Sequence, residues 1–316
     1  MDDTTRFILF GLAIPGVLGF VVGAVGAMGT RREAGLRSGA GESKGGRIAG
    51  HVIIGVVLAV LAGALTLSTY GVHGAAEIPP VSSDDRLRIV PVVLLLAALL
   101  LVIVRMVRSM RGAVEGTVDH ILAGLMAASS VGGAAIALGR RADWGTMTGA
   151  VGLGVLASVG ALALYRVQSA GGRARAGVVL MGLAAAVGAA LTGTGSVKLG
   201  QYGFGAVAVA TGVVLGSLLL RGSLRALSLG MLIAFVFVLL GNGIQFSETP
   251  WWVAIVLGLV APVAWVADAL ISRRLRPGVG AAVTVAAAAC VAIAAVAPGL
   301  KSLVDFMTGA PTSQGE

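Results

Sequence analysis

The sequence predicts an all-α protein, a polytopic bundle of about ten transmembrane helices with no soluble domain. Hydrophobic residues make up 57% of the 316 residues and charged residues only 12%, about half of the roughly 25% that soluble domains carry. The apolar residues form long runs, and the charged residues are almost confined to short gaps between those runs. Positive charges concentrate in alternate gaps, and no gap is long enough for a folded soluble domain.

Each apolar run is expected to be one helix. About 20 apolar residues span the hydrocarbon core as a helix, and lipid offers no partners for backbone N–H and C=O groups, so runs of this length cannot be open strands. The expected helices are 7–28, 48–71, 89–104, 117–139, 145–165, 176–195, 199–220, 226–244, 251–271 and 278–300.

Some boundaries and segments need separate comment. The run 89–104 is short and is expected to borrow residues from its flanks, and a very tight turn must separate 176–195 from 199–220. We expect 29–47 to be a flexible basic cytoplasmic loop and 301–316 to be a short polar C-terminal tail. Pro15 and Pro262 lie inside their runs and are expected to kink the first and ninth helices, because proline removes one helical hydrogen bond.

Glycine is abundant inside the runs, with 49 residues in the chain. Helices in lipid associate by close packing at small residues, and the spacings Gly19-x3-Gly23 and Gly145-x3-Gly149 are local examples. At this glycine frequency such spacings arise by chance, so neither is evidence for a dimer.

The distribution of lysine and arginine predicts the orientation. Sixteen of the 23 lie in the odd gaps, counted from the N-terminus, and these residues are retained on the cytoplasmic side. Both termini are therefore expected on the outer side of the membrane. We expect this to be the cell (cytoplasmic) membrane of a bacterium with a GC-rich genome. Aromatic residues at the predicted outer ends agree with this orientation: Tyr70, Trp144, Tyr202, Trp251 and Trp252.

The formal charge of +9 does not predict a nucleic-acid partner, because the basic residues are scattered in short clusters at helix ends. The single cysteine, Cys290, allows no internal disulfide and no cysteine-based zinc site. Neither Gly-x-Ser-x-Gly nor His-Glu-x-x-His occurs. We therefore expect no catalytic residues, no metal site and no cofactor.

Two histidines leave one cofactor alternative open. His51 and His120 lie near the starts of the second and fourth expected helices, at similar depth on the cytoplasmic side. Two such histidines could ligate a b-type haem, although a second pair that would carry electrons across the membrane is missing. The other interpretation is interfacial histidine bonded to water or lipid headgroups.

Asp119 and Asp268 are the acidic residues expected within helical runs. A charge in hydrocarbon costs about 2.5–3.5 kcal/mol even on the most lenient scale, so such residues are often functional. Both lie at cytoplasmic helix ends, Asp119 after Arg108 and Asp268 before Arg273, so interfacial ion pairing is the alternative to a proton or cation site. Pro262 on the same helix favours Asp268 as the functional one.

Asn242 is the single asparagine of the chain and lies between two glycines, Gly241 and Gly243. The triplet is expected to break the outer part of the eighth helix, where freed carbonyl groups and the amide could line a substrate or ion path. The simpler interpretation is an ordinary helix C-terminus with left-handed asparagine or glycine.

The cytoplasmic face is expected to bind anionic lipid. The odd gaps hold sixteen basic residues against three acidic ones, and each basic residue near an anionic surface contributes about 1 kcal/mol of attraction. The densest clusters, where the lipid contacts are expected, are Arg105, Arg108 and Arg111 and then Arg273, Arg274 and Arg276. Asp119 and Asp268 lie beside these clusters and should therefore be paired and ionised.

Polar groups are sparse inside the helices, and this favours a non-enzymatic structural or accessory subunit with a membrane-protein partner. The first alternative is a proton-coupled secondary transporter of a small or apolar solute, with Asp119 or Asp268 as the proton carrier. The second is a membrane enzyme or a b-type haem protein that uses the two histidines.

Overall fold

The computed structural model of the chain is helical wherever it describes secondary structure. It describes residues 3–37, 44–73, 83–110, 144–169, 173–194, 196–220, 226–246, 249–271 and 274–308. The helices are α1 (Asp3–Arg6), the π-helix η1 (Phe7–Ala13), α2 (Ile14–Arg37), α3 (Lys44–His73), α4 (Ser83–Met110), α6 (Trp144–Ser169), α7 (Arg173–Gly193), α8 (Val197–Leu219), α9 (Ala226–Phe246), α10 (Trp251–Leu270) and α11 (Pro277–Thr308).

The helical membrane class predicted from the sequence is confirmed. Within the described ranges, eight helices are long and apolar enough to cross a bilayer, and a shorter apolar stretch, Ile89–Val104, lies inside α4. The expected run 117–139 lies outside the described residues, so the predicted total of about ten spans is compatible with this structure. The expected tight turn between α7 and α8 is present: α7 ends at Gly193, and the Ser196 hydroxyl caps α8 by accepting from the Leu199 amide at 3.3 Å.

Helix extends well beyond the apolar runs, which corrects two expected segments. Most of 29–47, expected to be a loop, is helical, because α2 continues to Arg37 and α3 begins at Lys44. The predicted tail 301–316 begins as helix, since α11 continues to Thr308. Arginine, lysine, alanine and leucine are good helix formers, so a helix that leaves the hydrocarbon core can continue in water. The run 89–104 likewise becomes the 28 residues of α4.

The N-terminal helix changes its winding just before its proline. Residues Phe7–Ala13 form the π-helix, and the Ile14 amide donates to the Leu9 carbonyl, five residues earlier. Pro15 follows directly and has no amide hydrogen to donate, and its ring would crowd the carbonyl of residue 11 in an ordinary α-helix. The wider π turn therefore falls where the sequence interrupts α-helical bonding. In α10 the helix continues through Pro262.

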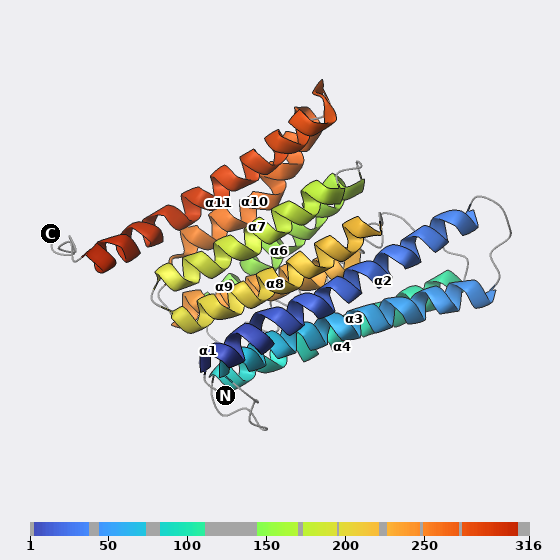
Figure 1. Cartoon of the computed structure of the whole chain (residues 1–316), viewed down its shortest axis with the longest axis horizontal. Coiled ribbons are helices and arrows are strands. Elements are labelled where there is room, and N and C mark those ends of the chain that lie inside the picture. Colours follow the sequence, from blue (N-terminus) through green and yellow to red (C-terminus); the bar gives the residue numbers. More distant parts are fainter. Residues whose placement is uncertain are drawn as a thin grey trace.

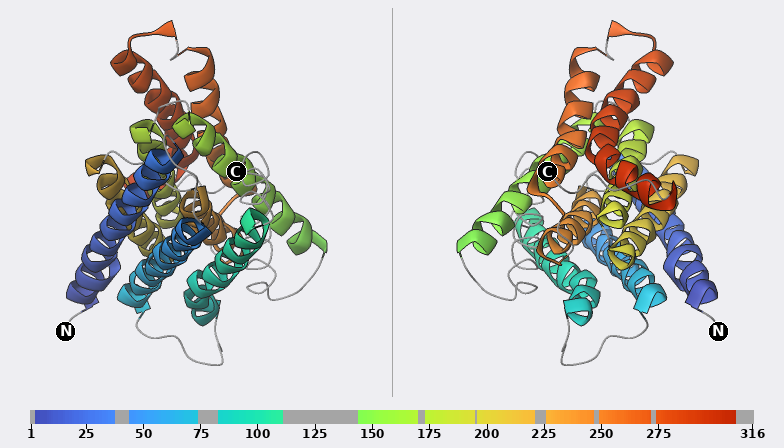
Figure 2. Two further views of the ribbon diagram at one scale, coloured as in Figure 1. Left: turned by 90° about the vertical axis from the view of Figure 1, so that its right-hand side faces the viewer. Right: turned by 90° about the vertical axis from the view of Figure 1, so that its left-hand side faces the viewer.

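The helices run back and forth along the long axis of the molecule (Figure 1). The start of α1 and the end of α11 lie in the left half of Figure 1, whereas α2 ends at the far right and α10 ends at the top, right of centre. Because basic clusters expected in the cytoplasm follow α2 and α10, we refer to the end of the bundle where these two helices finish as the predicted cytoplasmic end. Figure 2 shows the hairpin of α10 and α11 projecting from one side of the bundle.

Helix α9 forms the centre of the bundle. It packs against α6, α8, α4, α7 and α3, and 89% of the segment Ser228–Gln245 is buried. Phe235 and Phe237 are among its fully buried side chains. By contrast, 33% of an 18-residue apolar stretch within Gly278–Pro298 and 28% of one within Asp3–Met28 are buried, so these two helices lie at the periphery.

The closest helix contact joins α2 to α8 through glycine. A Cβ atom on Gly216 would lie 2.8 Å from the Ala24 nitrogen, and one on Gly212 would lie 2.7 Å from the Phe20 nitrogen. Gly23 faces α8 in the same way, since its Cβ would lie 2.9 Å from the Ser217 nitrogen. The Gly19-x3-Gly23 spacing is therefore used within the chain, where the absence of side chains lets two backbones touch.

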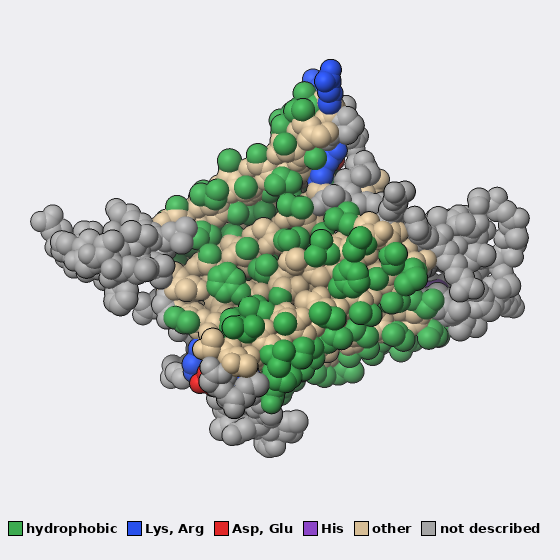
Figure 3. All heavy atoms as spheres, in the orientation of Figure 1, with side chains coloured by type: hydrophobic (Ala, Val, Ile, Leu, Met, Phe, Trp, Pro, Cys, Tyr) green, Lys and Arg blue, Asp and Glu red, His purple; other side chains and the backbone are tan. Residues whose placement is uncertain are grey.

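On the face shown in Figure 3, apolar side chains are spread over the surface between the two ends, interspersed with backbone and other side chains. Residues such as Val17, Leu100 and Ile293 are more than 60% exposed. This distribution is typical of a lipid-facing surface. Trp251 and Trp252 are 45% and 42% exposed at the start of α10.

Tyr202 was expected among the interfacial aromatic residues, and that expectation was wrong, because its side chain is fully buried. It lies on the same stripe of α8 as Leu199, Ala206 and Val209, and α8 is packed against both α2 and α7.

Candidate functional site

A buried carboxylate near the predicted cytoplasmic end is the centre of the candidate site. Asp268 lies two residues before Leu270, the last residue of α10, and belongs to the buried stripe of α10 that includes Leu257, Ala261 and Ala264. These positions recur every three or four residues, so the helical period places the carboxylate on the face that packs against the bundle. The residue is 2% exposed.

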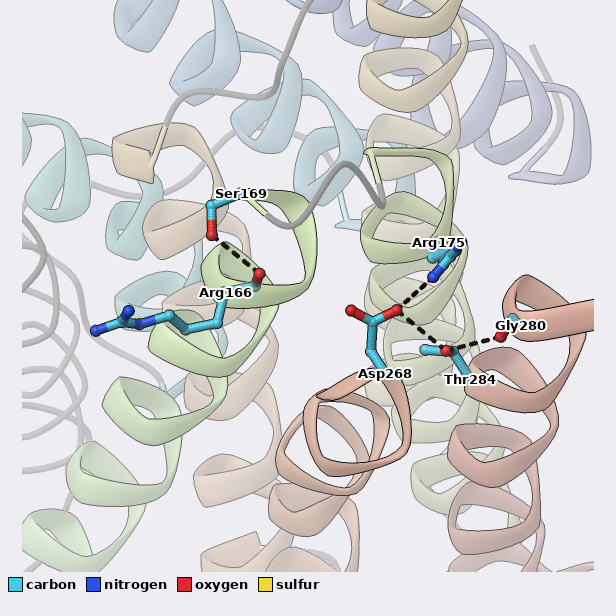
Figure 4. Close-up of polar contacts among 6 residues, drawn as sticks. All are labelled: Arg166, Ser169, Arg175, Asp268, Gly280 and Thr284. Carbon is cyan, nitrogen blue, oxygen red and sulfur yellow. Dashed lines mark hydrogen bonds and ion pairs between the residues drawn. The ribbon is translucent and has the colours of Figure 1, made fainter. Parts of the chain in front are cut away.

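Two other helices supply the partners of this carboxylate (Figure 4). Arg175, in the first turn of α7, donates from Nη1 to Oδ1 of Asp268. Thr284 of α11 places its hydroxyl oxygen 3.5 Å from the same Oδ1 and 3.0 Å from the Gly280 carbonyl oxygen. The polar cluster Arg175–Asp268–Thr284 therefore joins three helices at one point, and we call it the three-helix clasp.

The clasp pairs a buried carboxylate with a partly buried guanidinium. The Asp268 side chain is 3% exposed and the Arg175 side chain 21%. Desolvation of two charges largely offsets their attraction, so the pair adds little net stability, but removal of one partner leaves the other charge buried and typically costs about 3–5 kcal/mol. The stability of the folded chain with either Asp268 or Arg175 in this position therefore depends on the presence of the other.

The partner of Asp268 differs from the one expected. We expected pairing with the cluster at Arg273–Arg276, but Arg274 and Arg276 are exposed and Arg273 lies outside the described residues. The ion pair instead uses Arg175, which lies 93 residues away in the sequence. The sequence predicts that Arg175 and Asp268 lie on the same side of the membrane. Many other pairs of charged residues meet that criterion, so it does not identify this pair.

Arg166 lies near the clasp in the close-up but extends away from Asp268 (Figure 4). Its side chain is exposed, and its carbonyl oxygen accepts from the Ser169 hydroxyl at 3.0 Å. The clasp therefore takes one arginine from the fifth gap and leaves another at the surface.

An apolar cavity of about 90 Å³ lies between α7, α10 and α11, further along α7 and α11 than the clasp residues Arg175 and Thr284. It is lined by valine, alanine and glycine: Val178, Val179, Gly182, Val260, Val285, Ala288, Ala289 and Ala292. Val178 and Val179 follow Arg175 by about one helical turn, and Val285 follows Thr284 directly. The candidate site is thus amphipathic, with a polar end formed by the clasp and an apolar end formed by the cavity.

The helix is not broken at Asn242, which corrects an expectation. Helix α9 continues through residues 241–243 to Phe246, so neither an interruption nor a helix C-terminus lies at the triplet. The physical reason is tight packing: a Cβ on Gly241 would lie 2.9 Å from Leu153 Cδ1, and one on Gly243 would lie 2.9 Å from Thr249 Oγ1. The glycines thus serve close contact within a helix.

Asn242 is 3% exposed, and its Oδ1 makes no hydrogen bond to the part of the chain that the structure describes. Beside it, Thr249 and Thr194 place their hydroxyl oxygens 2.9 Å apart, and the Thr249 amide donates to the Gly243 carbonyl at 3.2 Å. The threonine contacts fasten the connection between α9 and α10 to the end of α7.

The structure describes only some of the remaining predicted site residues. His51 is 7% exposed on α3, whereas His120 and Asp119 lie outside the described residues, so the expected histidine pair stays a prediction. Among the described residues, no three His, Cys, Asp or Glu side chains are grouped so that they could hold a metal ion.

Of the six arginines expected to contact lipid, Arg274 and Arg276 are exposed. The backbone of Arg105 and Arg108 belongs to α4, although their side chains lie outside the described part, as does Arg111.

Comparisons with protein-family models, with curated proteins and with solved structures find no match for this chain.

Proposed function

We propose that the chain is a non-enzymatic structural or accessory subunit of a membrane complex. The observation that carries the proposal is the way in which the buried charges are used: Asp268 and Arg175 are bonded to each other and tie α10 to α7. A carboxylate held in this way stabilises an arrangement of helices and needs no substrate. The enclosed α9 and its close apolar packing support the same reading.

The peripheral helices support a role for a partner in the membrane. About two thirds of the Gly278–Pro298 segment is not buried within the chain, and its outer side carries small and apolar residues, including Ile293 at 64% exposure. Small residues let a second helix approach closely. A partner subunit on this side would bury the surface that lipid otherwise covers.

Purification from native membranes in mild detergent tests this proposal. The tagged chain, expressed from its own promoter, should migrate on a native gel as a complex of defined mass, with a second membrane protein in fixed ratio. An Ile293→Trp variant should weaken the complex, and a Val17→Trp variant on α2 is the matched control with similar exposure, 63%. A lone monomer in both gentle and harsh detergents would contradict the proposal.

A proton-coupled transporter is the second candidate, favoured by the position of Asp268 beside the apolar cavity. A proton carrier must release and regain its proton in each cycle, which an asparagine cannot do. Purified protein in liposomes with a trapped pH-sensitive dye distinguishes the candidates. The accessory role predicts the same proton leak for the wild type, for Asp268→Asn and for empty liposomes. Flux through the wild type that Asp268→Asn abolishes would establish the transporter.

A further inference from the structure

The cavity between α7, α10 and α11 has a simple structural cause. Gly182, Ala288 and Ala292 lie where the three helices face one another, and their side chains are too small to fill the space, while Val260 and Val285 close its sides. The lining has almost no polar surface. Cavities lined only by aliphatic groups stay free of water, so the natural occupant of this space is hydrocarbon.

The cavity is accessible from the lipid-facing surface. Val178 on its rim is 40% exposed, and Ala289 is also exposed. The medium outside this surface is expected to be the acyl region of the bilayer, so the hydrocarbon that can enter is a lipid chain. A side opening of this kind suits one chain of a membrane lipid better than a solute from water.

The depth of the cavity also fits an acyl chain below a headgroup. Gly182 is seven residues beyond Arg175 along α7, and Ala292 is eight beyond Thr284 along α11, which correspond to about 10 and 12 Å at 1.5 Å per residue. A lipid whose headgroup lies level with the clasp would therefore place the first part of one chain along the cavity.

The charges at this end select the headgroup. The described charged side chains at the predicted cytoplasmic end are Arg166, Arg175, Asp268, Arg274 and Arg276, and the single carboxylate is paired with Arg175. Arg274 and Arg276, in the connection between α10 and α11, are exposed and leave net positive charge at this end of the molecule. Arginine binds phosphate well because its planar fork matches the phosphate oxygens.

We propose that the cavity between α7, α10 and α11 binds one acyl chain of an anionic glycerophospholipid, whose headgroup lies beside the three-helix clasp and Arg274–Arg276. The lipid fills the space that small residues leave and adds its negative charge to a surface with excess arginine. This site goes beyond the accessory function, which requires no lipid at a defined position.

Site-specific quenching tests the position of the chain. A fluorophore is attached at Val178→Cys in a Cys290→Ser background, and the protein is reconstituted into vesicles of phosphatidylcholine that contain trace lipid with a nitroxide on one chain. Val266→Cys is the matched control, because Val266 is 47% exposed on the opposite side of α10 from Asp268 and at similar depth. Nitroxide-labelled phosphatidylglycerol should quench at position 178 several-fold more than labelled phosphatidylcholine, with no such preference at 266.

Native mass spectrometry of the protein tests the binding itself. Arg274→Gln combined with Arg276→Gln should weaken retention of phosphatidylglycerol about 30-fold, since each arginine contributes about 1 kcal/mol. Lys198→Gln, exposed at the opposite end, should leave retention unchanged. Ala288→Leu should fill the cavity and displace the lipid, whereas Ala294→Leu on the exposed side of α11 should not.

Specific outcomes would overturn the proposal. Equal quenching by the two headgroups at position 178 would remove the selectivity for anionic lipid. Equal retention by Ala288→Leu and Ala294→Leu would remove the cavity as the chain site. If Ala288→Leu does not fold, the comparison of quenching at positions 178 and 266 still tests whether anionic lipid binds at the cavity, because neither position lies in the packed interior.

Discussion

Helix α9 and the α10–α11 hairpin are held in the molecule by different means. Large side chains of α9 such as Phe235 and Phe237 are fully buried, and the helix packs against α3, α4, α6, α7 and α8. On α11 the buried stripe consists of small residues, Gly280, Thr284 and Ala288 among them, and a cavity remains between it and α7. The centre is thus fixed by filled volume, whereas the hairpin combines packing of α10 against α6 and of α11 against α7 with one polar cluster at its end.

This difference predicts which substitutions should lower the stability of the fold and by which mechanism. In the centre, loss of volume leaves a cavity that cannot collapse. At the hairpin, loss of volume matters less because lipid can enter, while loss of one charge matters more because its partner is left in an apolar environment. Each of the following variants distinguishes these two mechanisms.

The largest effect is expected at the clasp. Arg175→Gln leaves the buried Asp268 carboxylate without this partner, so it should lower the free energy of unfolding by about 3–5 kcal/mol. Asp268→Asn should cost less, because the Arg175 side chain that remains is 21% exposed. The measurement is unfolding in mixed micelles by titration with a denaturing detergent. Arg166→Gln, which changes an exposed arginine, is the control, and a loss equal to that of Arg175→Gln would show that the clasp has no special role.

The next effect concerns the filled centre. Leu239→Ala removes a fully buried side chain from α9 and should cost about 2–5 kcal/mol because the surrounding helices cannot close the space. Ile293→Ala on α11 removes a side chain that is 64% exposed and should change stability by less than about 0.5 kcal/mol. Similar losses in the same titration would mean that the contrast between centre and periphery is not energetic.

A smaller effect is expected at the contact of α2 with α8. Gly216→Ala would place Cβ 2.8 Å from the Ala24 backbone nitrogen, and overpacking of this kind costs about 1–3 kcal/mol. Gly26→Ala is a matched control on α2, because a Cβ there meets nothing within 4 Å, so this change should be neutral or stabilising through better helix propensity. Thermal unfolding of the two variants should move in opposite directions.

The smallest effect is expected at Asn242, the polar exception in the apolar centre. Its Oδ1 has no hydrogen-bond partner in the described part of the chain, so Asn242→Leu removes a buried acceptor at similar volume and should be nearly neutral or slightly stabilising. A loss of several kcal/mol would instead reveal a partner of the amide and reopen the interpretation as a substrate or ion path.

The sequence was sufficient for the class of fold and for most helices, because the length of apolar runs and the exclusion of unpaired backbone from lipid leave little choice. It was less informative about helix ends, since helix continues in water beyond the apolar run, as at Arg37 and Thr308. It also misplaced Tyr202, because an aromatic residue near a helix end can face either the bilayer surface or the protein interior.

The candidate site could be predicted only in part. Asp268 was recognisable because a carboxylate in an apolar run is costly. Its partner was not, because the pairing with Arg175 depends on how α7 and α10 are placed in space, and local sequence proximity favoured Arg273 and Arg274. The cavity was equally hidden, since it arises from the absence of volume at Gly182, Ala288 and Ala292 on two different helices.

The double-mutant cycle between Arg175 and Asp268 tests the central claim most directly. The unfolding free energies of the wild type, Arg175→Gln, Asp268→Asn and the double variant are compared, since two residues that act independently give additive losses. The clasp predicts that the double variant is more stable than the sum of the single losses requires, by about 1–3 kcal/mol. Additive losses within about 0.5 kcal/mol would contradict the account.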